Sequence, residues 1–378
     1  MRIGILTGGG DVPGVNRCLK AFVERVALDG HEVIGIRRGW AGLVDYDLDD
    51  PEGSAERSLY ALDVERVRTI DRSGGTVLHT SRVDPSRVEP FELPHFLAHR
   101  QLGDGPYDVT AHILTVVDGL QLDAIVAIGG HDTLVYALRL HHEGVPVIGI
   151  PKTMDNDVHG TDYCLGFSTA VTRSVEFIHQ LRTSTGSHER IAVVELFGRH
   201  SGETSLVAAY LASADRALIC EVPFDPERLA ALLVEDRRRN PSRYSMVTIS
   251  EGARMMGEEP PVVDPLAPSS GIGAATGAFI THLTGQDVIA QSLGHLMRSG
   301  RPDSLDLMAA TNFAVMAADL TVDDERGRLV GLQSGTYGDM DLEVIDQGVK
   351  RVDVAALYDA DAYRPKVRTV DGKPMFLY

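Results

Sequence analysis

The sequence predicts an α/β protein built from two doubly wound domains, and three observations favour this class. Apolar runs of strand length, such as residues 123–130 (DAIVAIGG) and 145–150 (VPVIGI), do not alternate with polar residues, which is typical of parallel strands buried on both faces. Segments with the apolar spacing of helices separate these runs. The alternation starts anew near Gly166, and a chain of 378 residues is too long for one simple core.

Charge and cysteine content exclude several kinds of partner. Lys plus Arg number 36 and Asp plus Glu number 54, so the net charge is −18, which argues against a general nucleic-acid or anionic-membrane surface. Cys18, Cys164 and Cys220 are few and widely spaced, which is typical of buried small apolar residues in a cytosolic protein. The sequence has no secretory leader pattern and no apolar run of roughly 18 residues, so we expect a cytoplasmic protein that does not enter a membrane.

The stretch from residue 123 to residue 157 carries the densest group of reactive side chains. It reads as a strand, a helix over residues 133–144 and a second strand. Because ligands of open α/β sheets bind where parallel strands end, polar clusters at both strand ends predict metal–phosphate chemistry there. The alternatives are turn-capping carboxylates and a solvated loop lysine. The clusters comprise His131, Asp132, Lys152, Asp155 and Asp157.

Two glycine-rich turns predict an anion site. Residues 2–7 read as a strand that runs into Gly8-Gly9-Gly10, followed by a helix over residues 17–28, an arrangement that points backbone N–H groups at a phosphate. A second turn at residues 73–76 is followed by Arg82. A simple tight turn and a solvated arginine are the alternatives. Pro13 breaks the G-x-G-x-x-G pattern, which disfavours a nicotinamide-linked dehydrogenase.

The remaining elements are predicted from the spacing of apolar residues along the sequence and from the signals that start and end helices. We predict an irregular excursion over residues 83–107 and polar loops over residues 183–189 and 255–268. Further strands are predicted over residues 31–36, 190–196, 218–222, 244–249 and 287–293. Further helices are predicted over residues 109–120, from Gly166 to about Arg182, and over 204–214, 226–235, 274–283 and 303–320.

Seven motifs occur in a fixed order along the chain: GGGDVPGVN (8–16), GGTVLHTSR (74–82), AIGGHDT (127–133), PKTMDND (151–157), SHERIAVVELFGRHSG (187–202), SEGA (250–253) and LGHLMRSGRP (293–302). Together they resemble the phosphofructokinase family over about residues 1–320. The resemblance implies two α/β domains with the active site in the cleft between them. A phosphoryl-donor domain would span residues 1–165 with about 300–345, and a sugar-phosphate domain would span 166–299 with the C-terminal tail.

The resemblance also implies a reaction and its residues. A phosphoryl group would pass to the 1-hydroxyl of fructose 6-phosphate with Mg²⁺ as cofactor, Asp155 would be the general base, and Arg199 would offset charge on the phosphoryl group. Metal ligands would be Asp157 and His131. The donor would contact Gly10, Asp11, Arg82, Gly129, Gly130, Asp132 and Thr133. The sugar phosphate would contact Thr153, Asp155, Arg190, Phe197, Gly198, Arg199, Glu251, His295 and Arg298. Arg190 would reach the neighbouring site of a homodimer or homotetramer.

Asp132 and Lys152 favour pyrophosphate as the donor. In the family that this chain resembles, ATP users usually carry glycine at both positions, whereas pyrophosphate users carry Asp and Lys. An Asp side chain adds bulk and negative charge where a nucleotide α-phosphate would lie, and a Lys ammonium stabilises charge on the reacting phosphoryl group. ATP remains the alternative donor.

Three departures from the family pattern concern the metal and the acceptor. His131 stands where the family usually has an acidic magnesium ligand, and an imidazole is a poor ligand for Mg²⁺. Ile289 stands where an arginine would contact the sugar 6-phosphate. The LMRSG and Phe197-Gly198-Arg199 segments also differ from the usual residues. Two further hypotheses therefore stay open: another ketose acceptor such as sedoheptulose 7-phosphate, and a non-catalytic paralogue that binds sugar phosphate.

Overall fold

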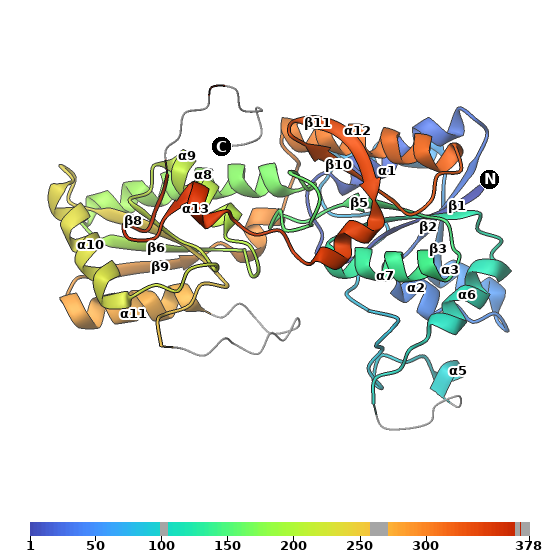
Figure 1. Cartoon of the computed structure of the whole chain (residues 1–378), viewed down its shortest axis with the longest axis horizontal. Helices are drawn as coiled ribbons and strands as arrows, with labels where there is room; N and C mark the ends of the chain where they lie inside the picture. Colours follow the sequence, from blue (N-terminus) through green and yellow to red (C-terminus); the bar gives the residue numbers. More distant parts are fainter. Residues whose placement is uncertain (99–104, 258–270, 367–370, 372–378) are drawn as a thin grey trace. The chain divides into compact units, whose positions relative to one another are not determined.

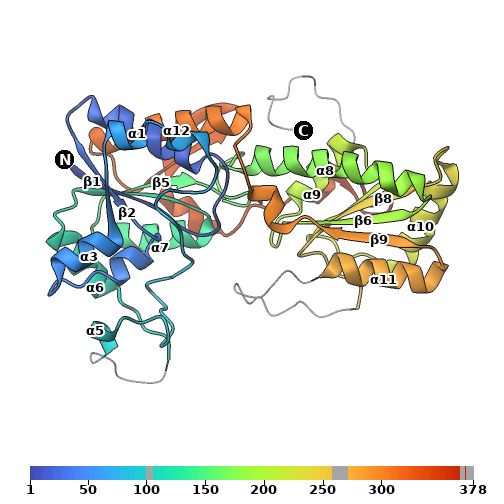
Figure 2. The same cartoon turned by 180° about the vertical axis from the view of Figure 1, so that it is seen from behind.

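The structure, a computed structural model, describes residues 1–98, 105–257, 271–366 and 371. The chain divides into two compact units (Figures 1 and 2). Unit 1 comprises Met1–Thr153, Val158–Gly166 and Ser299–Gly348, and unit 2 comprises Met154–Asp157, Phe167–Arg298 and Val349–Tyr378. The chain therefore passes from one unit to the other five times.

Unit 1 is built on a seven-stranded sheet in the order β11-β10-β5-β4-β1-β2-β3. The five inner strands are parallel, and the two edge strands are antiparallel to their neighbours. Every residue of β4 and β5 is buried, which is why these strands are continuously apolar in the sequence. The strands are β1 (Arg2–Thr7), β2 (Glu32–Ile36), β3 (Leu59–Leu62), β4 (Ala124–Gly129), β5 (Val147–Pro151), β10 (Arg328–Gln333) and β11 (Thr336–Asp341).

Helices cover both faces of this sheet (Figure 1). Helices α1 (Val15–Ala27) and α12 (Ser304–Val322) pack on each other over one face. Helices α6 (Thr110–Gly119) and α7 (His131–His142) lie over the other face. The shorter elements of unit 1 are α2 (Ala41–Val44), α3 (Pro51–Ser58), α4 (Val64–Val67), η1 (Ile70–Arg72), α5 (His95–Ala98) and η3 (Leu342–Gln347).

Helix α12 is the one helix among the described residues that is long and apolar enough to cross a membrane. Its most apolar 18-residue window has a mean hydropathy of 1.3, and 44% of that window is buried. The core helix of a folded unit passes the same test of length and composition, so this helix alone is weak evidence. The sequence expectation rested on uninterrupted apolar runs, which polar residues such as Asp306 interrupt in α12.

Unit 2 contains a four-stranded, all-parallel sheet in the order β7-β8-β6-β9. Its strands are β6 (Ile191–Leu196), β7 (Arg216–Leu218), β8 (Ser245–Ser250) and β9 (Val288–Ser292). Helices α8 (Phe167–Ser187) and α9 (Glu203–Ala212) cover one face, and α10 (Pro226–Arg239) and α11 (Ile272–Thr284) cover the other (Figure 1). The shorter elements are η2 (Gly294–Arg298), α13 (Val354–Leu357), β12 (Tyr358–Asp359) and β13 (Arg364–Pro365). The predicted doubly wound α/β class is confirmed.

Three local predictions are wrong, and each has a local cause. Helix α8 continues through the predicted polar loop to Ser187. The hydroxyls of Thr183, Thr185 and Ser187 donate to carbonyls one turn earlier, so these polar side chains find their hydrogen-bond partners within the helix. Strand β7 ends at Leu218 instead of running to residue 222, because a turn follows in which the Val222 N–H donates to the Ile219 carbonyl.

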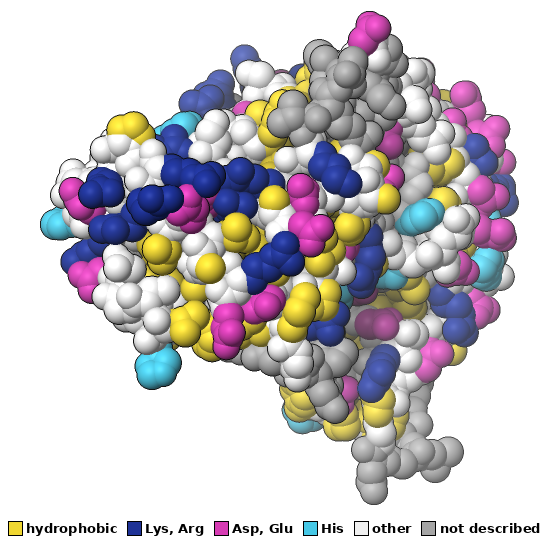
Figure 3. All heavy atoms as spheres, turned by 60° about the vertical axis from the view of Figure 1, so that its left-hand side comes forward, with side chains coloured by type: hydrophobic (Ala, Val, Ile, Leu, Met, Phe, Trp, Pro, Cys, Tyr) yellow, Lys and Arg dark blue, Asp and Glu magenta, His cyan; other side chains and the backbone are white. Residues whose placement is uncertain are grey.

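Helix α10 extends to Arg239, four residues past its predicted end. Arg238 and Arg239 both form ion pairs with Glu235 one turn earlier, which supports the last turn. Lys and Arg side chains gather in a patch on the face shown in Figure 3. Within the predicted excursion, residues 99–104 lie outside the described residues, as do residues 258–268 of the predicted loop.

Candidate active site

Three loops of unit 1 meet at one edge of its sheet. The glycine loop Gly8–Gly10 follows β1, the first turn of α7 follows β4, and Lys152 follows β5. Strand β4 pairs in parallel with both β1 and β5, so the three carboxyl ends are adjacent. The chain leaves β1 toward β2 on one side and returns to β4 on the other, which makes this edge the topological switch point where ligands of such sheets bind.

Lys152 joins these loops. Its residue is 2% exposed, and its Nζ donates to the carbonyl oxygens of Gly10 and of Gly8, the latter at 2.7 Å. Its backbone N–H donates to the Gly129 carbonyl at 2.9 Å. The lysine thus fixes the glycine loop against the end of β4 and brings a positive charge beneath it, a support role that the sequence did not indicate.

The side chain of Thr133 explains why residues 8 and 129 are glycines. A Cβ at Gly8 would lie 2.5 Å from Thr133 Oγ1, and a Cβ at Gly129 would lie 2.3 Å from Thr133 Cβ, so neither position has room for a side chain. Thr133 is buried in the first turn of α7, whereas Asp132, in the same turn, is exposed. An acidic residue there interacts favourably with the positive end of the helix dipole.

The other predicted donor contacts surround the same loop. Gly10, Asp11 and Gly130 are partly buried, and Arg82 is exposed. The second glycine turn lies beside Asp11, since a Cβ at Gly75 would be 4.0 Å from Asp11 Oδ2. The structure therefore brings the predicted donor residues together within unit 1.

The carboxyl ends of three parallel strands also carry the predicted sugar residues of unit 2. Phe197-Gly198-Arg199 follows β6, Glu251 follows β8, and His295 and Arg298 lie in η2 after β9. Nε of Arg199 lies 3.4 Å from Oε1 of Glu251.

Phe197 is the centre of a small stack. The guanidinium carbon of Arg298 lies 5.2 Å from the centre of the Phe197 ring, within cation–π range. The His295 ring contacts it edge-on, with ring centres 5.7 Å apart. The aromatic ring thereby holds a buried arginine and an exposed histidine at one end of the sheet.

Asp155 lies within an electrostatic cluster of unit 2. Burial raises the pKa of its carboxyl well above the ordinary value, and the carboxylates of Asp157 and Glu251 raise it further. Arg298 and Arg199 oppose this rise. Burial also raises the pKa of Glu251, which Arg199 counteracts. A partly buried carboxyl with a raised pKa, surrounded by two arginines and two acids, is typical of an acid–base centre.

Comparison with known proteins identifies the family of this chain. A model of the family described as "Phosphofructokinase" matches residues 2–321. The chain belongs to the phosphofructokinase family. The predicted family is thus confirmed, and the protein is an enzyme of this family.

Relatives of this phosphofructokinase-family enzyme carry two kinds of name. It is 33% identical over 370 residues to the "Pyrophosphate–fructose 6-phosphate 1-phosphotransferase" of Amycolatopsis mediterranei (strain S699), which covers 96% of this chain and 99% of the relative. It is 35% identical over 332 residues to the "ATP-dependent 6-phosphofructokinase" of Chloroflexus aggregans (strain MD-66 / DSM 9485), which covers 88% of this chain and 87% of the relative. Names at such similar identities do not separate the two donors.

A solved structure shows the same fold. The pyrophosphate-dependent phosphofructokinase from Marinobacter aquaeolei superposes with a TM-score of 0.76, and the match covers 97% of this chain and 89% of that one. At 16% sequence identity this likeness concerns the fold alone.

The enzyme's Arg190 lies apart from the Asp155 cluster. It precedes β6, whereas Phe197-Gly198-Arg199 follows the other end of this strand. Its Nη2 lies 3.3 Å from Asp287 Oδ2, and both side chains are exposed. Within one chain, Arg190 is therefore not part of the sugar cluster of unit 2. Ile289, in β9, is partly buried and pairs in register with Ala192 of β6.

The predicted metal ligands belong to different units, His131 to unit 1 and Asp157 to unit 2. Within the described ranges, no group of three or more His, Cys, Asp or Glu side chains is arranged to hold a metal ion. Nδ1 of His131 is inaccessible to solvent and has no hydrogen-bond partner among the described residues.

Three residues that the sequence analysis missed hold the loop of Asp155. Asn156 is fully buried with a left-handed backbone (φ 54°), and its Nδ2 donates to Glu203 Oε1 at 3.0 Å. Lys350 Nζ lies 3.2 Å from Glu203 Oε2, and the Lys350 N–H donates to the Asp157 carbonyl at 2.8 Å. Asparagine tolerates left-handed backbone, which was a usable signal for Asn156, but nothing in the sequence links residue 350 to residue 156.

We expect Lys350→Ala to lower kcat roughly 10- to 100-fold, because small displacements of a catalytic loop have effects of this size. Lys366→Ala is the matched control, since Lys366 donates to the Ala355 carbonyl in the same C-terminal segment. Lys350→Arg should restore much of the rate by keeping the ion pair with Glu203. Steady-state kinetics test this, and an Ala variant with unchanged kcat would remove Lys350 from the positioning of the loop.

Proposed function

We propose that this enzyme transfers a phosphoryl group from pyrophosphate to the 1-hydroxyl of fructose 6-phosphate, giving fructose 1,6-bisphosphate and phosphate. The observation that carries this proposal is the buried Asp155 carboxyl among Arg199, Arg298, Asp157 and Glu251. The reaction exchanges a phosphoanhydride for a phosphate ester, so it is reversible and suits glycolysis and gluconeogenesis alike.

In this proposal Asp155 accepts the proton of the attacking hydroxyl. A carboxylate whose pKa is raised is a stronger base than an ordinary aspartate, so burial favours this role. Arg199 would offset the charge on the phosphoryl group as it moves, a role that suits a delocalised guanidinium. His295 and Arg298 would bind the 6-phosphate, and Glu251 would accept hydrogen bonds from sugar hydroxyls.

The donor assignment rests on Lys152 and Asp132. The buried ammonium of Lys152 adds positive charge directly at the glycine loop, which favours a small, highly charged donor such as pyrophosphate. Relatives carry both donor names, so ATP is the second candidate, supported by the relative from Chloroflexus aggregans.

Mg²⁺ is the proposed cofactor, because it neutralises donor phosphates when bound. The buried carboxylate of Asp157 fits a hard cation that prefers oxygen, whereas the imidazole of His131 does not. Asp157 would hold the ion together with substrate phosphates and water. We further propose a cytoplasmic homo-oligomer in which Arg190 serves the neighbouring subunit, an arrangement that fits its position at the opposite end of β6.

An aldolase-coupled assay tests the proposal with purified protein, Mg²⁺ and fructose 6-phosphate, comparing pyrophosphate with ATP. We expect turnover with pyrophosphate and little with ATP. Sedoheptulose 7-phosphate is a parallel acceptor, because Ile289 supplies no charge to a terminal phosphate. Better turnover of that sugar would replace the acceptor, turnover with ATP alone would replace the donor, and no turnover with any pair would contradict the proposed activity.

The rate should depend on pH through Asp155. Because its pKa is raised above the ordinary value of about 4, the carboxylate becomes protonated as pH falls through that raised pKa, and kcat should fall at higher pH than for an ordinary aspartate. Glu251→Gln should shift this acidic limb downward, because the Glu251 carboxylate contributes to the rise. The pH profile of kcat at saturating sugar tests this, since titration of the phosphate groups is common to both proteins. An identical acidic limb in both would contradict the assignment.

A further inference from the structure

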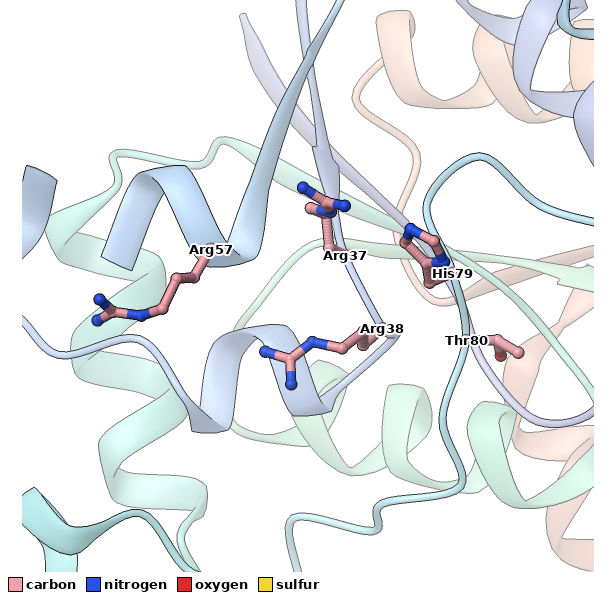
Figure 4. A pocket seen from close by; sticks show the side chains of 5 residues that line it. All are labelled: Arg37, Arg38, Arg57, His79 and Thr80. Atoms are coloured by element: carbon pink, nitrogen blue, oxygen red, sulfur yellow. The ribbon is translucent and has the colours of Figure 1, made fainter. Parts of the chain in front are cut away.

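A basic pocket lies in unit 1 outside the predicted site residues. It has a volume of about 550 Å³ and is lined by Arg37, Arg38, Arg57, His79 and Thr80 (Figure 4). Arg37 and Arg38 follow β2, Arg57 lies in α3, and His79 and Thr80 belong to the segment after the second glycine turn. No acidic residue is among those that line it in the described part of the chain.

The charges of this pocket are only partly compensated. Arg38 Nη2 lies 2.8 Å from Asp45 Oδ2, and Arg57 Nη2 lies 3.2 Å from Asp50 Oδ2. Arg37 is partly buried, and its guanidinium makes no hydrogen bond or ion pair with any residue that the structure describes. In a chain of net charge −18, such a concentration of cations indicates a site for an anion.

The pocket shares its walls with the glycine loop. Thr80 Oγ1 donates to the Gly9 carbonyl at 2.6 Å, and the Gly9 N–H donates to the Ser81 carbonyl at 2.8 Å. On the other wall, a Cβ at Gly39 would lie 2.9 Å from the Thr7 carbonyl oxygen. Ser81 Oγ joins the two walls by donating to the Arg38 carbonyl at 2.6 Å.

Two of the basic residues have unusual backbones. Arg38 (φ 60°) and His79 (φ 57°) are left-handed, a conformation that non-glycine residues rarely adopt. A hydrogen bond from the Arg38 N–H to the Leu78 carbonyl at 2.8 Å ties the two segments in this state. Strained backbone of this kind concentrates at ligand sites, which adds an independent sign of function.

We propose that this pocket binds the far end of a linear inorganic polyphosphate whose reacting phosphate lies on the glycine loop. The inference rests on the proposed phosphotransfer, because it names a donor class for the same site. Guanidinium and imidazole groups suit phosphate oxygens, and three arginines and a histidine line this pocket without an acidic residue among its described lining. With tripolyphosphate, the hydroxyl oxygen bonds the terminal phosphorus, the bridging P–O bond breaks, pyrophosphate leaves, and Asp155 receives the hydroxyl proton.

Calorimetric titration of the full chain with Mg²⁺, in the absence of sugar, tests the pocket separately from the reaction. We expect Arg37→Ala to weaken tripolyphosphate binding at least tenfold, as loss of a charge-assisted contact does, and to weaken pyrophosphate binding less than twofold. Arg37→Lys should keep most of the affinity. Arg68→Ala is the matched control, because Arg68 is an exposed arginine of unit 1 outside the pocket.

Three outcomes would overturn the proposal. These are equal weakening of both ligands by Arg37→Ala, no weakening of tripolyphosphate, or tighter binding of ATP than of tripolyphosphate that depends on Arg37. Should Arg37→Ala fail to fold, His79→Ala provides the same comparison at an exposed position. Absence of turnover with every donor would contradict the proposed reaction, whereas the binding titration would still decide on the pocket.

Discussion

Replacement of Asp155 by asparagine is expected to lower kcat roughly 10²- to 10⁴-fold, the range of general base catalysis, and at the same time to stabilise the protein. The stability effect follows from linkage. The pKa of the Asp155 carboxyl is higher in the folded protein than in the unfolded chain. The free energy of unfolding is therefore highest below the unfolded pKa, where the carboxyl is protonated in both states, and it decreases as pH rises through the folded pKa. Above the raised pKa the ionised carboxylate opposes folding, and a neutral amide removes that penalty. Kinetics and a melting temperature a few degrees higher would report the two effects.

Asp215→Asn is the matched control for this experiment. Burial raises the pKa of Asp215 as well, and its carboxylate accepts a hydrogen bond from the Met246 N–H at 2.8 Å, but it lies outside the Asp155 cluster. The Asp215→Asn substitution should leave kcat unchanged. A kcat of Asp155→Asn within tenfold of the wild-type value would remove Asp155 from the role of general base.

Replacement of Lys152 by methionine is expected to have the second largest effect, a fall in kcat/KM for pyrophosphate of roughly 10²- to 10³-fold. The substitution removes a buried charge and leaves the Gly8 and Gly10 carbonyls without their donor, which costs roughly 1–3 kcal/mol for each unsatisfied group. Denaturant unfolding and steady-state kinetics measure both consequences.

Lys20→Met is the control for Lys152→Met. Lys20 also donates to a backbone carbonyl in unit 1, that of Arg68, but lies away from the glycine loop. The double substitution Asp132→Gly with Lys152→Gly should weaken use of pyrophosphate and raise the relative use of ATP. Unchanged pyrophosphate kinetics in the double variant would refute the donor assignment.

The sequence predicted those parts of the molecule whose physical cause is local. Strands β4 and β5 were readable because both faces are buried and every position is apolar. The glycine loop was readable because a strand, glycines and a helix follow one another directly. The carboxyl ends of β6 and β8 could likewise be predicted, because Arg199 and Glu251 each follow an apolar run of strand length.

Features that depend on residues far apart in the chain could not be predicted from the sequence. Lys152 was predicted to act on the substrate, but its bonds to the glycine loop depend on how β1 and β5 are ordered in the sheet. The link from Asn156 through Glu203 to Lys350 joins three distant segments. The basic pocket likewise combines Arg37 and Arg38 after β2, Arg57 of α3, and His79 and Thr80 of the GGTVLHTSR motif, so no single segment of the sequence indicated it.

The five passages of the chain between the two units set the order in which a nascent protein can be completed. Strand β5 leaves the ribosome long before β10, which pairs with it at Ile148 and Gly149. The edge of β5 that β10 later covers therefore has no strand partner while the elements from α8 to β9 are synthesised. Such edges are prone to aggregation during biosynthesis. Lys350 emerges later still, so the loop of Asp155 receives this restraint only after β10 and β11 have been synthesised. A chain that ends before residue 350 would contain every strand of the seven-stranded and four-stranded sheets but would lack the Lys350 contacts to Glu203 and Asp157.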